Sequence, residues 1–271
     1  MTEPTAYQPI SLGDFALDNG CVLANAQIGI ATWGASPSKA ERIVVLPSYY
    51  SGTALSYAPW IGADGLFDPT RCCIVSFDQF GAGKSSKPSD NGSLAKWGFP
   101  SLADSVRAQK YTLGALGVQS VDMVAGWSMG GMQAFAWYAL FPDFIGSALA
   151  ICATPSASAV NRIFLEGIRS VLVGKHDAES LRDFDALLPE QKQARLAAFG
   201  AVYAGWAYSD EFFLSGAYRD FGYESPEAVA AKWAKDHEAM DATDLAAQLD
   251  AWLTAKTPAI EAQASEQQNP W

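Results

Sequence analysis

Ser128 is the residue best suited to covalent chemistry, because it lies between Gly126 and Gly130 and follows an apolar run. Enzymes of acyl transfer place a nucleophilic serine on a sharp turn between a strand and a helix. Small residues two positions away on each side leave room for that turn. The helix that follows adds positive potential beside the serine oxygen. The pattern therefore predicts a serine nucleophile; the alternative is a structural glycine turn with an incidental serine.

An oxyanion formed by attack of Ser128 needs hydrogen-bond donors. The backbone N–H of the next residue, Met129, is one candidate. The second donor is expected in the loop after an earlier buried strand, where the N–H of Tyr50 is our candidate and that of Tyr49 the alternative. Both tyrosines could instead only line the substrate pocket. Tyr49 and Trp127 predict an apolar pocket, which favours small uncharged esters.

A serine nucleophile also needs a base, and the chain has two histidines. Residues 171–174 could form a late strand, and Asp177 with His237 would then complete a triad in the order Ser, Asp, His. The surrounding sequence has helical spacing, however, which favours placing both histidines in a helical cap. The sheet would then lack its last two strands, and the acid and base would follow residue 256 and lie beyond the end of the chain at 271.

Two patterns that could bind a cofactor or a metal do not meet the requirements of such sites. The glycine-rich stretch at 81–85 carries Gly-Lys-Ser, but Asp78 stands where a phosphate-binding loop needs glycine. The four cysteines show no C-x-x-C spacing and are expected to be buried free thiols. We expect no cofactor and no metal.

The elements that must position Ser128 follow from the apolar runs. Asp18-Asn19-Gly20 favours a hairpin turn with positive φ at both Asn19 and Gly20, within residues 13–33. Strands that are apolar on both faces and alternate with helices indicate a mostly parallel sheet flanked by helices. The buried strands are predicted at 42–47, 72–78, 121–126 and 145–152, and the helices at 101–116 and 130–140.

The pattern changes near residue 155, and a strand signal is scarce from there to 256. We expect an α/β core at 1–154, a helical cap at 155–256 and a loose polar tail at 257–271. The predicted cap helices lie at 160–174, 188–204, 210–217, 225–238 and 242–255.

The composition excludes several classes of partner. Of 271 residues, 49% are hydrophobic and the formal net charge is −11. An acidic protein repels phosphate backbones and anionic lipids, so we expect neither nucleic acid nor a membrane surface as partner. The chain carries no recognisable targeting segment, which predicts a cytoplasmic protein. Self-association into a homo-oligomer stays open.

The stretch GWSMGGMQAFAWYALFPD at 126–143 resembles the nucleophile elbow of homoserine O-acetyltransferase-like proteins of the α/β-hydrolase fold. Further segments are similar to that family in the same order, and the likeness covers residues 13–255. These segments are SVRAQ at 105–109, NRIFLEGIRSVL at 161–172, YAGWAYSDEFF at 203–213 and DATDLAAQL at 241–249.

The resemblance implies an α/β-hydrolase fold with a helical cap and a reaction through an acyl-Ser128 intermediate. The acyl group would pass from an ester or thioester to water or to an alcohol. Homoserine enzymes of the family carry a cap arginine near the position of Ala201, and Arg195 is the nearest basic residue. Trp127 and the tyrosine loop also depart from those enzymes, so the esterase-like branch fits best. Hydrolysis of small carboxylic esters is the leading expectation. The alternatives are an acetyl-CoA-dependent O-acetyltransferase and a catalytically incomplete binding module.

Overall fold

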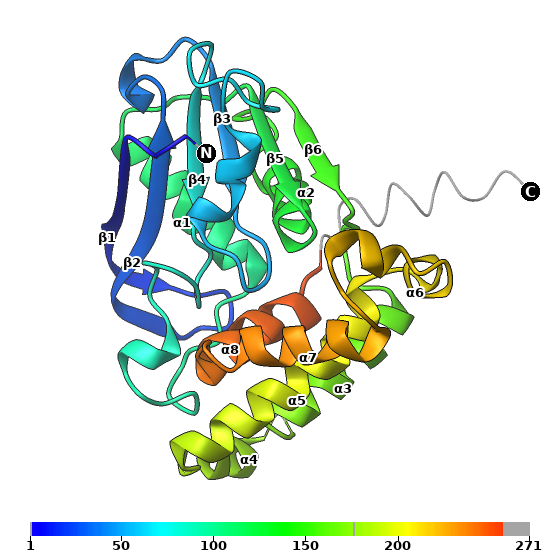
Figure 1. Ribbon diagram of the computed structural model, residues 1–271. Helices are drawn as coiled ribbons and strands as arrows, with labels where there is room; N and C mark the ends of the chain where they lie inside the picture. The colour runs from blue at the N-terminus through cyan, green and yellow to red at the C-terminus, as the bar shows by residue number, and fades with distance from the viewer. Residues whose placement is uncertain (1, 176, 257–271) are drawn as a thin grey trace, which may run out of the picture.

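The computed structural model describes residues 2–175 and 177–256. It consists of a mixed sheet flanked by helices, with a further group of helices beyond one end of the strands (Figure 1). The sheet has six strands in the order β1-β2-β4-β3-β5-β6. The first two strands form an antiparallel hairpin, β2 is antiparallel to β4, and the remaining pairs are parallel. The strands are β1 (Ala6–Ala16), β2 (Val22–Trp33), β3 (Ile43–Pro47), β4 (Cys73–Phe77), β5 (Met123–Trp127) and β6 (Ala148–Ile151).

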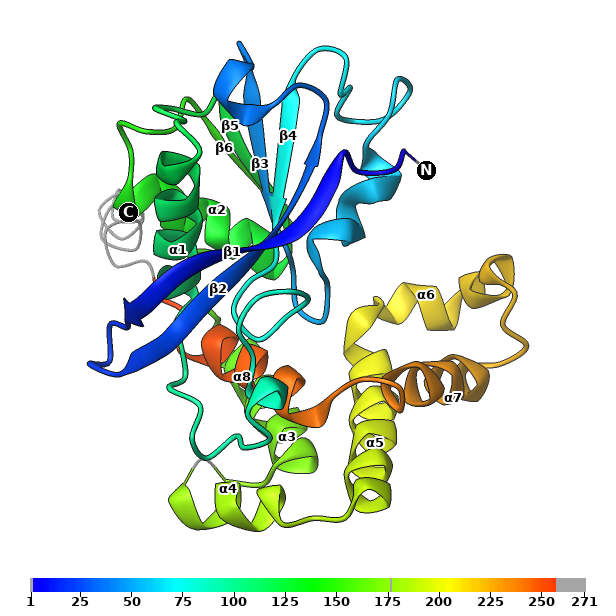
Figure 2. The same cartoon turned by 90° about the vertical axis from the view of Figure 1, so that its left-hand side faces the viewer.

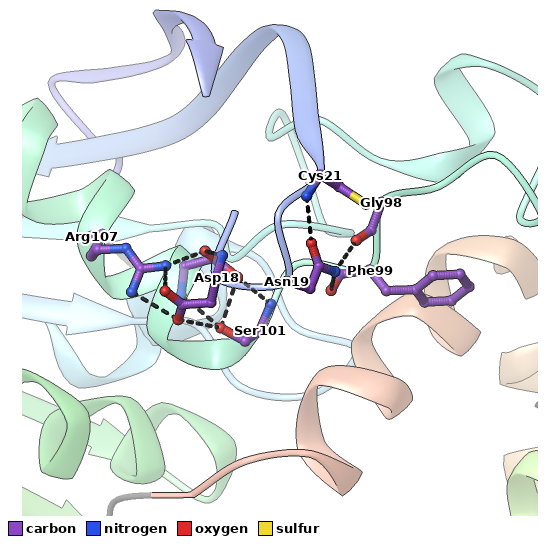
Figure 3. Close-up of polar contacts among 8 residues, drawn as sticks. Asp18, Asn19, Cys21, Gly98, Phe99, Ser101 and Arg107 are labelled. Atoms are coloured by element: carbon purple, nitrogen blue, oxygen red, sulfur yellow. Dashed lines mark hydrogen bonds and ion pairs between the residues drawn. The ribbon is translucent and has the colours of Figure 1, made fainter. Parts of the chain in front are cut away.

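The predicted hairpin is confirmed, although β1 begins before residue 13. Of the two turn residues Asn19 and Gly20, only Gly20 has a positive φ, at 84°. Asn19 contributes through its side chain instead, because its Nδ2 donates to the carbonyl of Gly98 at 2.6 Å. Arg107 in α1 (Leu102–Ala115) pairs with Asp18 of the turn at 2.7 Å (Figure 3). These contacts fix the hairpin tip against the start of α1.

The parallel strands form the centre of the protein, and every residue of β3 and β4 is buried. Helices α1 and α2 (Met129–Leu140) cover one face of the sheet, with Val45, Val75 and Val124 in their shared core. A 3-10 helix at Ala54–Trp60 covers the other face, so the two faces have separate cores (Figure 2). Strand β6 lies at the edge of the described sheet and pairs there with β5.

Six helices form the group that we call the cap, which lies beyond the carboxyl ends of the parallel strands (Figure 1). Five of the six begin at a Ser or Asp whose side chain accepts a first-turn N–H, which explains where they start. The sequence missed α4, whose eight residues bury only Leu181 and Phe184. The cap helices are α3 (Ala159–Leu172), α4 (Ala178–Asp185), α5 (Pro189–Ala207), α6 (Asp210–Leu214), α7 (Pro226–His237) and α8 (Ala242–Leu253).

Buried polar contacts hold the cap together and join it to the core. Arg169 of α3 pairs with Asp250 of α8 at 2.7 Å, and both side chains are buried. Asp244 of α8 accepts hydrogen bonds from the N–H and the hydroxyl of Ser89, which belongs to a loop of the core. Among the described residues, no helix combines the length and the apolar character that crossing a bilayer requires. The predicted tail at 257–271 lies outside the described residues.

Candidate active site

The turn between β5 and α2 places Ser128 in a strained backbone conformation, with φ 51° and ψ −121°. Its N–H donates to the carbonyl of Ile151 in β6 at 2.8 Å. The neighbouring glycines are sterically required: a Cβ at Gly126 would lie 2.1 Å from the carbonyl of Gly130, and a Cβ at Gly130 would lie 2.4 Å from the carbonyl of Pro47. Strain of this kind persists only where the surrounding structure imposes it, and it is concentrated at functional sites.

Tyr57 joins this elbow to the end of β3. Its hydroxyl donates to the carbonyl of Pro47 at 2.9 Å and accepts from the N–H of Trp127 at 3.0 Å. The side chain is fully buried, and burial raises the pKa of this phenol, so the hydroxyl keeps its proton at every physiological pH. Tyr57 thus fixes the distance between the turn at Ser128 and the end of β3.

Ser128 lines a cavity of about 580 Å³ between the strand ends and the cap. The described lining is rich in aromatic residues and contains no Asp, Glu, Lys or Arg. Burial raises the pKa of Tyr50 and Tyr203, so these phenols stay uncharged as well. The rings come from the core at Tyr49, Tyr50 and Trp127, and from the cap at Tyr203, Trp206, Tyr208, Trp233 and Trp252.

The loop at 48–53 carries Tyr49 and Tyr50 to the cavity that Ser128 lines, and we call it the oxyanion loop after the donor that the sequence predicts in it. Tyr50 is buried against Tyr203 and Trp252, and its hydroxyl donates to the carbonyl of Leu245 in α8 at 3.3 Å. Within residues 2–175 and 177–256, the backbone N–H groups of Tyr49, Tyr50 and Met129 donate to no partner. Met129 is the first residue of α2 and its side chain is buried, so only its N–H is available as a candidate donor beside Ser128.

The sequence of the chain matches the alpha/beta hydrolase fold family over residues 42–174, a segment that includes the elbow. The chain therefore has the α/β-hydrolase fold. An ethyl acetate hydrolase of Pseudomonas veronii is 30% identical over 227 residues, which cover 81% of this chain and 63% of that protein. A homoserine O-acetyltransferase of Chloroherpeton thalassium is 31% identical over 153 residues, covering 53% of this chain and 40% of the relative.

Among solved structures, an acetylester hydrolase from Corynebacterium glutamicum superposes with a TM-score of 0.85 at 25% identity, covering 97% of this chain and 78% of that one. The resemblance inferred from the elbow and cap segments is therefore confirmed, since both esterases and homoserine O-acetyltransferases are relatives. The chain spans less than two thirds of the length of the curated relatives just named.

Of the two histidines, only His237 lies within the described residues, and no hydrogen bond joins it to Ser128 there. His176 lies outside the described residues. His237 is 5% exposed in α7, and its Nδ1 donates to the carbonyl of Trp233 at 2.7 Å. A Cβ at Gly200 would lie 2.8 Å from that nitrogen, so the ring fills the close contact between α5 and α7. Its position in the cap agrees with the preferred sequence interpretation.

The alternative triad through Asp177 is wrong in its structural premise. Residues 171–174 are not a strand, because α3 continues to Leu172. Asp177 is exposed and caps α4, where its carboxylate accepts the N–H of Ser180 at 2.8 Å and these bonds lower its pKa. The carboxylate therefore serves the start of a surface helix. In the described ranges, no side chain forms a hydrogen bond with the Ser128 hydroxyl.

Two further expectations concern charged and thiol groups near the cavity. Arg195 does not line it, because its guanidinium donates to the carbonyl of Leu172 at 3.4 Å. The expectation that all cysteines are buried is wrong for Cys21 and Cys152, which are exposed. Cys152 follows β6 and lines the cavity, because the edge position of that strand leaves its end uncovered. No metal-ligand cluster occurs within the part of the chain that the structure describes.

The rejected phosphate loop proves to be filled by a side chain. Asp78 is fully buried and accepts the N–H groups of Lys84 at 2.7 Å and Ala54 at 2.6 Å. A Cβ at Gly83 would lie 2.3 Å from this carboxyl group, so the loop wraps a carboxylate rather than an open space.

Sequence reasoning missed most of the cap residues that complete the cavity. Tyr203, Trp206 and Ala207 follow the i, i+3, i+4 spacing of one helix face on α5, and that signal could have identified them. Tyr57 left no comparable signal, because its role depends on contacts between distant segments.

Proposed function

We propose that this α/β-hydrolase acts in serine-dependent acyl transfer, foremost the hydrolysis of small uncharged carboxylic esters through an acyl-Ser128 intermediate. The observation that carries the proposal is the strained serine at the β5–α2 elbow, on the wall of a cavity whose described lining holds no charged side chain. The relatives named as an ethyl acetate hydrolase and an acetylester hydrolase support the same class of substrate.

The proposed reaction begins when the Ser128 hydroxyl oxygen attacks the ester carbonyl carbon and gives its proton to a base. The carbonyl oxygen becomes an oxyanion, which accepts from the N–H of Met129 and from that of Tyr50, with Tyr49 as the alternative donor. The alcohol leaves with a proton, and water then attacks the acyl-serine to release the acid and restore Ser128. We propose that the base lies outside the described residues, since His237 does not line the cavity that Ser128 lines.

The cavity favours neutral over charged substrates. A carboxylate or ammonium group moved from water into an aromatic cavity loses hydration, and no described lining residue offers an opposite charge. Homoserine carries both charges, which is why hydrolysis is preferred to transfer onto an amino acid. An acyl-enzyme trapped by homoserine or hydroxylamine but not by water would identify a transferase instead.

The test compares p-nitrophenyl acetate with a p-nitrophenyl ester that carries a free carboxylate, using the 271-residue chain. We expect acylation that depends on Ser128 and favours the neutral ester. If the base is absent, this acylation is about 10²–10⁴ slower than in an esterase with a complete triad. Ser128→Ala abolishes the reaction, whereas Ser215→Ala on the cap surface does not alter it. Release of p-nitrophenol that is equal in the wild-type chain and in Ser128→Ala would overturn the proposal.

A further inference from the structure

The oxyanion loop is held in place by a side chain of the cap. Gln248 of α8 is 3% exposed, and its Oε1 accepts from the N–H of Ser51 at 2.9 Å. The same oxygen accepts from Nε2 of Gln79 at 3.1 Å, and Nε2 of Gln248 donates to the carbonyl of Gly81 at 2.8 Å. One cap side chain therefore bridges the loop after β3 and the loop after β4.

A second contact anchors the other end of the oxyanion loop. Gln133 of α2 donates from Nε2 to the carbonyl of Ser48 at 2.8 Å. Its Oε1 accepts from Gln109 at 2.7 Å, and Gln109 in turn accepts from the indole N–H of Trp137 at 2.8 Å. The core thus holds the loop at Ser48, and the cap holds it at Ser51.

The two candidate oxyanion donors lie between these anchors. Tyr49 and Tyr50 are the residues between Ser48 and Ser51, and Gln79 also donates to the carbonyl of Tyr49 at 3.2 Å. Ser51 has a φ of 59°, a left-handed conformation that is unfavourable for serine and therefore needs external contacts to persist. Loss of the bond from Ser51 to Gln248 would free the loop to relax at this residue.

We infer that Gln248 is a positioning residue, which orients the N–H groups of the oxyanion loop and makes catalysis depend on this one contact between cap and core. The inference rests on the proposed function, since it assigns a role to the oxyanion donors of that reaction. Gln248 does not line the cavity, so it acts on the developing oxyanion through the loop and not on bound ester. Its removal changes the rate of acylation and leaves the affinity for a neutral ground-state ligand intact.

The principal variant is Gln248→Met, which keeps the length of the side chain and removes its hydrogen bonds to Ser51, Gln79 and Gly81. We expect acylation of Ser128 by p-nitrophenyl acetate to slow about 10- to 100-fold. This loss of rate should not exceed the one that removal of an oxyanion donor itself causes. The dissociation constant of a non-reactive ether of the same shape, followed by tryptophan fluorescence, stays unchanged. Hydrogen exchange of the 48–53 backbone becomes faster.

The matched control is Asp244→Leu, one turn earlier on the same helix. It removes the hydrogen bonds to Ser89, which also join the cap to the core but do not touch the oxyanion loop. The control should lower the melting temperature without the selective loss of acylation. Equal losses of acylation in both variants would mean that cap docking in general matters, and would overturn the specific role of Gln248.

If Gln248→Met does not fold, Gln79→Met tests the same network, because Gln79 donates both to Gln248 and to the carbonyl of Tyr49. It should also slow acylation, and the double variant should lose little more than either single variant, because both act through one network. Absence of Ser128-dependent acylation in the wild-type chain would overturn the proposed function together with this inference. Normal wild-type acylation that is unaltered in both glutamine variants would overturn the inference alone.

Discussion

The β5–α2 elbow and the oxyanion loop differ in which residues fix their backbone conformation: neighbours in the sequence at the elbow, and distant residues in the loop. At the elbow, the room for Ser128 is provided by glycines two positions away on each side. In the oxyanion loop, Ser48 is held by a residue 85 positions away and Ser51 by one 197 positions away. A local backbone requirement leaves a mark in the sequence, whereas a contact between distant segments does not. The comparison also predicts that the elbow tolerates changes in the cap and that the loop does not.

The largest expected effect on stability and acylation comes from Gly126→Ala, which places a side chain inside the close-packed elbow. The new Cβ would lie 2.1 Å from the carbonyl of Gly130, so the turn must move. We expect unfolding free energy to fall by about 3 kcal/mol and acylation of Ser128 to be lost. Urea denaturation and intact-protein mass after treatment with a fluorophosphonate measure both.

Gly114→Ala is the control for that substitution, because a Cβ there meets nothing within 4 Å and the residue lies in α1. It should stabilise the protein by about 0.5–1 kcal/mol, the usual gain for replacing glycine inside a helix. Equal stability of Gly126→Ala and the wild-type chain would show that the elbow is not close-packed.

Tyr57→Phe tests the contact that joins the two regions. Removal of the Tyr57 hydroxyl leaves the carbonyl of Pro47 without its donor and the N–H of Trp127 without its acceptor. We expect a loss of about 1–3 kcal/mol of stability, the cost of unsatisfied buried groups. Displacement of the elbow relative to the loop should slow acylation about 10- to 100-fold.

Tyr138→Phe on the exposed side of α2 serves as the matched variant and should alter neither quantity. Acylation at the wild-type rate in Tyr57→Phe would mean that elbow and loop are aligned independently of each other.

The smallest expected effect is a pH dependence of the free energy of unfolding, which arises from Asp244 where the cap contacts the core. Burial raises the pKa of the Asp244 carboxyl from 3.8 to about 6, although the hydrogen bonds from Ser89 act in the opposite direction. The folded state then binds this proton more tightly than the unfolded state, so the free energy of unfolding falls as the pH rises from 3.8 to about 6.

We expect this contribution to be about 1 kcal/mol, less than the full linkage value because the carboxyl is partly exposed. Asp244→Asn should remove that part of the slope in denaturation curves at pH 4 and pH 7. An identical slope in the variant would assign the dependence to other groups. Among the described residues, no titratable side chain forms a hydrogen bond with Ser128, so the strain of the elbow should not respond over this range.

The parallel strands, the elbow and most cap helices could be predicted from the sequence because each is encoded locally. Buried strands appear as short apolar runs, and the nucleophile turn appears as glycines around Ser128. Helix α4 was missed because two buried residues are too few to show a period. The sequence left a strand at 171–174 open as the alternative to a helix, because β-branched valines near a helix end also suit a strand, and α3 shows that the preferred helix is present.

The candidate site was predictable only in part. Ser128, Trp127 and the two tyrosines line one cavity, as their sequence context suggested. The choice between Tyr49 and Tyr50 as oxyanion donor stays a prediction. The roles of Tyr57, Gln79 and Gln248 depend on which distant elements meet, and a single sequence does not carry that information.

The central claim is that the Ser128 hydroxyl is the group that accepts the acyl chain, and a covalent adduct tests it most directly. The 271-residue chain is incubated with a small neutral fluorophosphonate, digested, and mapped by tandem mass spectrometry. The account predicts one phosphonylated residue, Ser128, with no adduct in Ser128→Ala and a slower reaction in Gln248→Met. Adduct formation at another residue with Ser128 unmodified would contradict the account.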